Sequence, residues 1–477
     1  MRMLLLVCGC LMVSLAAGYD QDYCYADEEN PYLMFGTKTA YEFVHEKPRN
    51  PENVPHCQPV QFWLLSRHGT RYPNKKDIAR MEHLPELRDQ ILRNHEIRKQ
   101  GRLCERDLEN LREWTLHVFP SQAENLANQG YDDMKFMARR FKTQFPALLN
   151  RTYHDDLFLF RSTDTQRTKA SAKAFSDGLF GSGTYVNIPE PYPNDTLIKG
   201  YDICRKWKDE IDNNNQTYEE KRLYEMGTEM NRLLQNVSSR LGFSYSLTYR
   251  QLDDMYDICR YEKAWNIRKV SPWCAVFSKE ELLVIFNYIY LLEYREDLED
   301  YYQAGYGNDL NIKLGCPPVK DFMDRFRQIE ERNPQPAGVF YFSHRPMVQM
   351  VLSRLDIAKD EEHLTHSNYN LMKNRRWRTS KISSFSTNLA AVFFKCETGE
   401  MHRVMFFIGE KLYNYKGCNV GLCNWSFVKQ KFEHIANECS LDFCSSDWNG
   451  AKQIHGSSLS LIVVAVFIFH TMIANRM

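Results

Sequence analysis

This sequence lacks a net charge. Its 61 Lys and Arg residues balance 61 Asp and Glu residues, and no segment stands out as strongly basic. Proteins that bind nucleic acid carry clustered basic residues, so we expect no nucleic-acid partner. The sequence also lacks an internal repeat, a zinc-binding cysteine pattern and an apolar run of the roughly 20 residues that cross a membrane as a helix.

What is present is enough apolar material for a large core. The chain has 477 residues, of which 43% are hydrophobic and 13% aromatic. This length fits one large domain with an insertion, or two domains. Residues 1–18 have the pattern of a secretory signal peptide, with a basic start at Arg2, an apolar stretch at 4–15 and small residues before the expected cleavage site.

The C-terminal residues 450–477 have the pattern of a lipid-anchor signal that is removed. Small residues at 449–451 precede a polar spacer at 452–458 and an apolar tail at 459–473. This order predicts a glycosylphosphatidylinositol anchor attached at Asn449, and therefore a membrane contact through the lipid. A short membrane span and a free secreted form are the alternatives.

Cysteines and sequons agree with a secretory-pathway protein at the cell surface or outside the cell. Two of the fourteen cysteines lie in the predicted signal peptide, and the even number that remains fits disulfides in an oxidising compartment. Cys418/Cys423 and Cys439/Cys444 are close enough for local bridges, but the sequence leaves the connectivity open. Glycosylation sequons begin at Asn150, Asn194, Asn215, Asn236 and Asn424.

The most informative stretch is Arg-His-Gly-Thr-Arg at 67–71. It follows the apolar segment 60–65, which reads as a buried strand. Ligands of open α/β sheets bind beyond the carboxyl ends of the strands. Arg67 and Arg71 stay protonated and offer planar forks that fit phosphate oxygens, and the surrounding positive charge keeps His68 unprotonated. This arrangement favours nucleophilic attack on phosphorus.

Two further apolar segments end in residues of the same kinds. The segment 157–160 leads into Arg161, and the segment 338–342 leads into His344. We therefore expect these side chains to meet at one edge of the sheet. Lys75 directly follows the motif and is a candidate for a second contact with a polyanionic ligand, although a solvated helix face is the simpler interpretation.

The intervening residues have helical spacing. Residues 191–332 contain no clear strand, which predicts a mostly helical insertion that covers the catalytic face. The runs 390–394 and 403–408 predict a hairpin at the sheet edge. We thus expect an α/β domain over 19–190 and 333–444, with a central, mostly parallel sheet.

These motifs resemble the histidine acid phosphatases, and within them the inositol polyphosphate phosphatases. The matching segments are 35–39, 67–73, 271–274, 305–307 and 368–369, spread over nearly the whole mature chain. The resemblance implies a central sheet with a helical lid. It also implies phosphorylated small-molecule substrates, namely inositol polyphosphates such as phytate, with 2,3-bisphosphoglycerate as a further candidate.

The resemblance also implies roles for individual residues. His68 matches the nucleophile that becomes a phosphohistidine, and His344 matches the second phosphate-binding histidine. Arg67, Arg71 and Arg161 match the arginines that hold the transferring group. No metal or other cofactor is expected, because the arginines supply the positive charge.

One departure from the family pattern concerns the proton donor. The family places Asp, or Ala-Glu in the inositol phosphate branch, after the second histidine, and this carboxyl protonates the leaving alkoxide. Here Arg345 and Pro346 follow instead, and neither can donate that proton. The alternatives to an inositol polyphosphate phosphatase are therefore a catalytically impaired surface protein that binds phosphorylated ligands, and a broad acid phosphatase.

Overall fold

The computed structural model describes residues 24–45, 54–277 and 288–445. Its strands form one sheet in the order β2-β3-β1-β4-β5-β6, with β7 paired to β5. The strand bounds are β1 Cys57–Arg67, β2 Phe158–Ser162, β3 Gly338–Ser343, β4 Asn388–Cys396, β5 His402–Ile408, β6 Lys411–Tyr413 and β7 Leu422–Asn424. The three strands predicted before the site motifs, and the predicted hairpin of β4 and β5, are confirmed.

The sheet is mixed, which corrects the expectation of a mostly parallel one. Only β2, β3 and β1 run parallel to one another, with Leu64 of β1 opposite Phe340 of β3. The pairs β1–β4, β4–β5, β5–β6 and β5–β7 are antiparallel. The short turn between β4 and β5 makes a hairpin, and a hairpin adds antiparallel strands to one side of the sheet. The α/β fold itself is confirmed.

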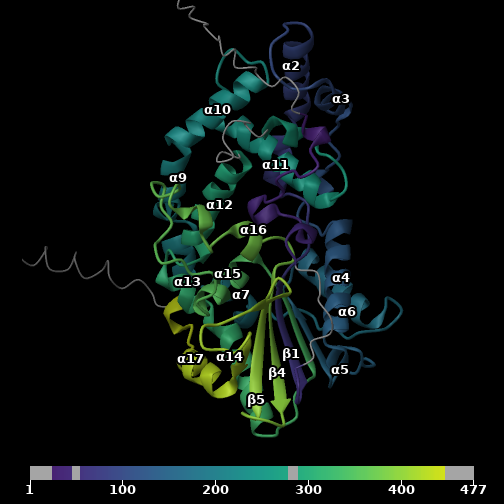
Figure 1. Ribbon diagram of the computed structural model, residues 1–477, viewed down its shortest axis with the longest axis vertical. Helices are drawn as coiled ribbons and strands as arrows, with labels where there is room; N and C mark the ends of the chain where they lie inside the picture. The colour runs from purple at the N-terminus through teal and green to yellow at the C-terminus, as the bar shows by residue number, and fades with distance from the viewer. Residues whose placement is uncertain (1–23, 46–53, 278–287, 446–477) are drawn as a thin grey trace, which may run out of the picture.

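Helices cover both faces of the sheet and extend beyond one end of it (Figure 1). Their bounds are α1 Lys75–Met81, α2 Leu84–Glu96, α3 Glu105–Glu113, α4 Asn128–Gln144, α5 Pro146–Leu149, α6 Gln166–Phe180, α7 Thr196–Ile203, α8 Arg205–Trp207, α9 Glu219–Glu225, α10 Thr228–Arg240, α11 Tyr249–Trp265, α12 Tyr288–Ala304, α13 Asp309–Leu314, α14 Cys316–Glu330, α15 Arg345–Arg354, α16 Thr379–Ile382 and α17 Trp425–Asn437.

Side chains of the central strand alternate between two apolar cores. Phe62 and Leu64 pack on one side with α4 and α6, where Phe141 makes an edge contact with Phe62. Trp63 and Leu65 pack on the other side with α14 and α15, where Phe322 meets the Trp63 ring. Because successive strand side chains point to opposite faces, a strand buried on both sides reads as a continuous apolar run.

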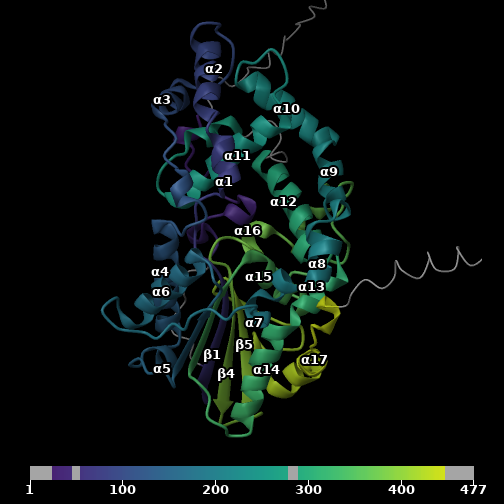
Figure 2. The same cartoon turned by 180° about the vertical axis from the view of Figure 1, so that it is seen from behind.

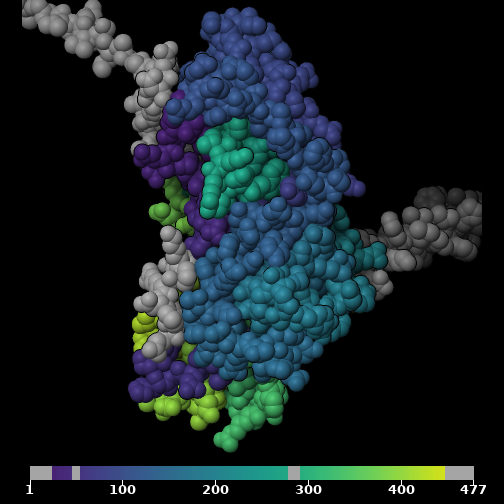
Figure 3. All heavy atoms as spheres, turned by 90° about the vertical axis from the view of Figure 1, so that its right-hand side faces the viewer, coloured from purple at the N-terminus to yellow at the C-terminus, as the bar shows by residue number. Residues whose placement is uncertain are grey.

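Helices α9 to α12 lie beyond the carboxyl ends of β1, β2 and β3, whereas α14 lies beside the sheet, as the view from behind shows (Figure 2). The described residues between 191 and 332 form helices and no strand, as the spacing predicts. Treating this stretch as a separate insertion domain stays a prediction. On the face shown in Figure 3, segments distant in sequence lie side by side: residues just after α11 lie near α4 and the N-terminal segment, and Arg268, Phe136 and Glu42 line one hollow there.

The described residues contain six disulfides, and four of them join segments that are at least 80 residues apart. They are Cys24–Cys104, Cys57–Cys396, Cys204–Cys444, Cys259–Cys274, Cys316–Cys439 and Cys418–Cys423. The local bridge Cys418–Cys423 is confirmed, but Cys439 and Cys444 do not pair with each other. Cys439 follows α17, which packs on α14, so it reaches Cys316 at the start of α14.

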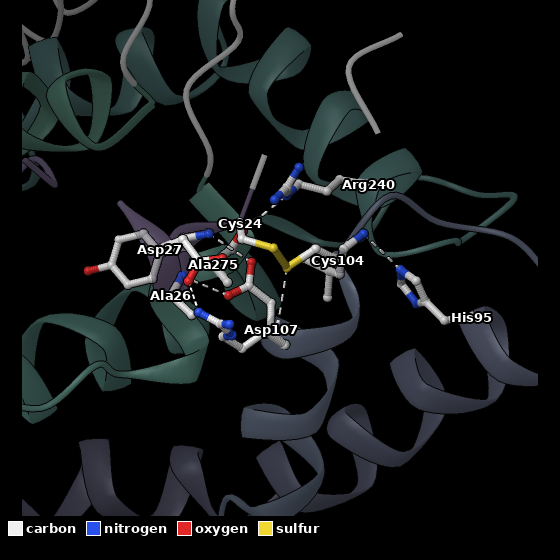
Figure 4. Close-up of a disulfide and its surroundings, with 11 residues drawn as sticks. Cys24, Ala26, Asp27, His95, Cys104, Asp107, Arg240 and Ala275 are labelled. Atoms are coloured by element: carbon white, nitrogen blue, oxygen red, sulfur yellow. Dashed lines mark hydrogen bonds and ion pairs between the residues drawn. A yellow bond between two sulfur atoms is a disulfide. The ribbon is translucent and has the colours of Figure 1, made fainter. Parts of the chain in front are cut away.

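The Cys24–Cys104 bridge ties the N-terminal segment to α3 (Figure 4). Beside it, the Asp107 carboxylate accepts hydrogen bonds from the backbone N–H groups of Tyr25 (2.9 Å) and Ala26 (3.0 Å). The two sulfurs and this carboxylate lie close together, but a sulfur committed to a disulfide is not a thiolate ligand. This cluster is therefore structural.

Within the described ranges, no helix is long and apolar enough to cross a membrane. The predicted signal peptide and the lipid-anchor signal at Asn449 lie outside these ranges. Of the predicted glycosylation sites, Asn236 is half-buried within α10, and the other four are exposed, namely Asn150, Asn194, Asn215 and Asn424.

Candidate active site

The loop after β1 brings His68 to the edge of the sheet by a close backbone approach. The His68 N–H donates to the Ser343 carbonyl (3.0 Å), which continues the pairing of β1 with β3. A Cβ at Gly69 would lie 2.4 Å from the carbonyl oxygen of Gly130 in α4, and a Cβ at Gly130 would lie 2.2 Å from the Thr70 oxygen. Both positions therefore require glycine.

The His68 ring is buried and held in one tautomer. Only 3% of the residue is exposed, and Nδ1 lies 2.9 Å from the Gly69 carbonyl oxygen. A carbonyl oxygen can only accept, so Nδ1 carries the proton and Nε2 keeps its lone pair. Burial and the nearby positive charges of Arg67 and Arg167 lower the pKa of His68 well below its usual value. A neutral imidazole with a free Nε2 is a competent nucleophile.

Arg67 is fixed by the protein backbone and not by a carboxylate. Its Nη1 donates to the carbonyl oxygens of Thr37 (2.6 Å) and Ser383 (2.5 Å), and its guanidinium lies 4.6 Å from the centroid of the Phe385 ring. Burial, followed by the charge of Arg71, lowers the pKa of Arg67. A buried arginine that shares a pocket with other arginines is a site for an anion.

Arg71 and Arg167 add further positive charge. The Nη1 of Arg71 donates to the Tyr72 carbonyl (2.7 Å) and lies 3.4 Å from the Tyr261 hydroxyl. Arg167 is the second residue of α6, and its weak contact with Glu124 is 3.7 Å long. Burial and the charge of Arg71 lower the pKa of Arg167. Both arginines line the same pocket, so they can act on one anion there.

His344 stands at the N-terminal cap of α15, immediately after β3. Its ring centroid is 5.7 Å from that of His68, and its Nε2 lies 2.9 Å from Thr163 Oγ1. Burial and the positive charge of Arg167 lower its pKa well below the usual value. Both histidines are therefore neutral.

These side chains surround one pocket of about 300 Å³. Its lining consists of Arg67, His68, Arg71, Thr165, Arg167, Lys199, Tyr201, Asp202, His344, Arg345 and Pro346. Of the predicted site residues, the structure thus brings together both histidines and two of the three arginines. The lining carries six arginine or histidine side chains that face a single volume large enough for a phosphate and part of its ester.

Two predicted phosphate-binding residues do not line this pocket. Arg161 makes a two-point ion pair with Asp195 (2.7 and 2.8 Å) and stacks on Tyr192, because its position on β2 directs it toward the start of α7. Lys75 is exposed at the start of α1. Arg167 takes the place expected for Arg161. The sequence feature that could have identified Arg167 is its position at the start of the helix after β2, where side chains lie over the strand ends.

Arg345 and Pro346 follow His344, where the motif resemblance predicts a proton donor, and Arg345 is already engaged in an ion pair. Arg345 pairs through Nη1 with Asp300 of α12, whose side chain is fully buried, and its Nη2 donates to Gln303 Oε1 (2.7 Å). Pro346 follows as the second residue of α15. Asp356 is exposed and pairs with Lys359 and Lys431, so it is not a replacement.

Comparison with known proteins identifies the family. The profile of the histidine phosphatase superfamily (branch 2) matches residues 60–408. The chain belongs to this superfamily. It is also 34% identical to multiple inositol polyphosphate phosphatase 1 of Drosophila melanogaster, over 98% of this chain and 99% of that protein, and 29% identical to the protein of the same name from Homo sapiens, over 87% and 88%. The resemblance inferred from the motifs is confirmed.

Solved structures share the histidine phosphatase fold. The phytase from D. castellii has a TM-score of 0.67 at 16% identity, covering 89% of this chain and 92% of that one. The multiple inositol polyphosphate phosphatase of Bifidobacterium longum, solved with inositol hexasulfate, has a TM-score of 0.60 at 12% identity, covering 81% and 94%. At these identities the comparison speaks for the fold alone.

Proposed function

We propose that this protein is a phosphomonoesterase that hydrolyses inositol polyphosphates such as phytate through a phosphohistidine at His68. The names of its relatives support the substrate class. The observation that carries the chemistry is the hydrogen bond from His68 Nδ1 to the Gly69 carbonyl, which leaves Nε2 unprotonated among arginines.

In the first step, His68 Nε2 attacks phosphorus, and the bond from phosphorus to the inositol oxygen breaks. Arg67, Arg71 and Arg167 hold the equatorial oxygens, where charge accumulates in the transition state. His344 adds a contact to the same group. The leaving alkoxide takes up a proton, and water then attacks the phosphohistidine, which releases phosphate and restores His68. In this assignment Arg167 replaces Arg161 as the third arginine.

A second candidate function is the binding of phosphorylated ligands without turnover. Arg345 and Pro346 favour it, because they remove the usual acid while the arginine cluster is retained. A positioned general acid contributes about 10²–10⁴-fold to a rate. Two further alternatives are a broad acid phosphatase and an enzyme that also hydrolyses 2,3-bisphosphoglycerate. Measuring activity on a set of phosphate esters distinguishes them.

The proposed setting is the secretory pathway, with the mature protein at the cell surface or secreted. Six disulfides support an oxidising compartment. Glycosylation at the four exposed sequons and a lipid anchor at Asn449 belong to this proposal.

The test is phosphate release by the purified protein from phytate and from p-nitrophenyl phosphate between pH 3 and 8. We expect turnover of both substrates by the wild type and none by His68→Ala. Wild-type protein that binds phytate and releases no phosphate from either substrate would favour the binding function instead.

A further inference from the structure

We propose that Asp202 donates the proton to the leaving alkoxide, a role that rests on the proposed function of the pocket. Arg345 and Pro346 occupy the positions of the usual acid. Of the residues that line the described pocket, Asp202 is the one carboxylate. Its side chain is 45% exposed, so a leaving group in the pocket can reach it.

The start of α7, before its kink at Lys199, is fixed to two of the parallel strands, and Asp202 follows the kink. At the end of β3, Ser343 Oγ donates to the Ile198 carbonyl of α7 (2.5 Å). Arg161 of β2 forms an ion pair with Asp195. The Asp195 carboxylate also caps α7, because it accepts hydrogen bonds from the N–H groups of Leu197 (2.9 Å) and Ile198 (3.1 Å). Arg161 is therefore a positioning residue for α7 and not a phosphate ligand.

The Asp202 carboxyl lies among charged groups. Its Oδ2 lies 3.3 Å from Lys199 Nζ, and its Oδ1 lies 3.7 Å from Lys208 Nζ. The pocket presents further cations and two neutral histidines, namely Arg67, Arg71, Arg167, Arg345, His68 and His344. Asp202 therefore lies in the same pocket as the groups expected to hold the phosphate of a substrate.

The proton balance is then complete. Protonated Asp202 gives its proton to the inositol oxygen as the bond from phosphorus to that oxygen breaks. The resulting carboxylate accepts a proton from the water that attacks the phosphohistidine, and this returns Asp202 to its starting form. One group serves as acid in the first step and as base in the second.

The chain offers a matched control for testing Asp202. Lys199 Nζ also contacts Asp164 Oδ1 (3.0 Å), and Asp164 does not line the pocket. Asp202→Asn removes the proton and the ion pairs with Lys199 and Lys208, whereas Asp164→Asn removes an ion pair with Lys199 alone. We expect Asp202→Asn to lower kcat on phytate about 10²-fold and Asp164→Asn to stay near the wild type.

Leaving-group dependence separates proton donation from a structural role. An inositol alkoxide needs a proton, whereas p-nitrophenolate leaves unaided. Asp202→Asn should thus hydrolyse p-nitrophenyl phosphate at nearly the wild-type rate. Over a series of phosphate esters, the hydrolysis rate of Asp202→Asn should fall more steeply with increasing leaving-group pKa than the rate of the wild type. Asp202→Glu should recover part of the phytate activity.

The proposal is overturned if Asp202→Asn keeps the wild-type kcat on phytate, or if its kcat falls by the same factor on phytate and on p-nitrophenyl phosphate. If either result is found and His68→Ala is inactive, the proposed function stands and only the role of Asp202 as proton donor is rejected. A wild type that turns over neither substrate overturns both.

Discussion

Replacing Arg345 with Ala should destabilise the protein strongly, because its partner is buried. The Asp300 side chain has no exposed surface and pairs with Arg345. Arg345→Ala therefore leaves a buried carboxylate whose other oxygen accepts a hydrogen bond from the Gln349 amide (2.6 Å). Removing one member of a buried ion pair costs about 3–5 kcal/mol. The lost hydrogen bond to Gln303 adds about 1 kcal/mol.

The measurement is urea unfolding at pH 7 with the disulfides intact, followed by tryptophan fluorescence. Arg345→Ala/Asp300→Asn is the matched control, since it removes the buried charge together with its partner. We expect the double variant to be more stable than Arg345→Ala alone. A loss below about 1 kcal/mol in the single variant, or equal losses in both variants, would refute the argument. A general acid restored by Pro346→Glu should therefore retain Arg345.

Three further predictions concern separate parts of the molecule. Arg167→Ala should raise KM and lower kcat on both phytate and p-nitrophenyl phosphate. Arg161→Ala should mainly lower activity on phytate, through the position of α7. The same changes in KM and kcat for both variants would contradict these assignments. Asp133 is buried beside Thr70, and burial raises its pKa to about 7. Between about pH 4 and 7 the folded carboxyl therefore keeps a proton that the unfolded one has released. The free energy of unfolding should fall as the pH rises from about 4 to 7, and it should fall less in Asp133→Asn than in the wild type. Phosphatidylinositol-specific phospholipase C should release the protein from expressing cells; retention after treatment, with no effect of truncation after residue 454, would exclude attachment at Asn449.

The strands and the motif that follows each of them could be predicted from the sequence. Strands buried on both faces read as short apolar runs, as residues 60–65 and 338–342 do. The mixed character of the sheet could not be predicted as easily, because it depends on which edge the β4–β5 hairpin joins. His68, His344, Arg67 and Arg71 were found because they lie in the motifs at the carboxyl ends of β1 and β3.

The residues that were missed depend on contacts between distant segments. Arg161 and Arg167 stand on either side of the same turn, and the choice between them follows from Asp195, 34 residues after Arg161. Asp202 lies in a helix that approaches the strand ends only through tertiary contacts. Similarly, Cys439 and Cys444 are neighbours in sequence but pair with cysteines of two different helical segments.

The central claim is covalent catalysis by His68, and trapping the intermediate tests it most directly. Protein mixed with ³²P-labelled phytate and quenched in alkali within the first turnovers should carry acid-labile label on the peptide that contains His68. His68→Ala should carry none. Label on another residue, or steady turnover with no labelled peptide under conditions that preserve phosphohistidine, would contradict the account.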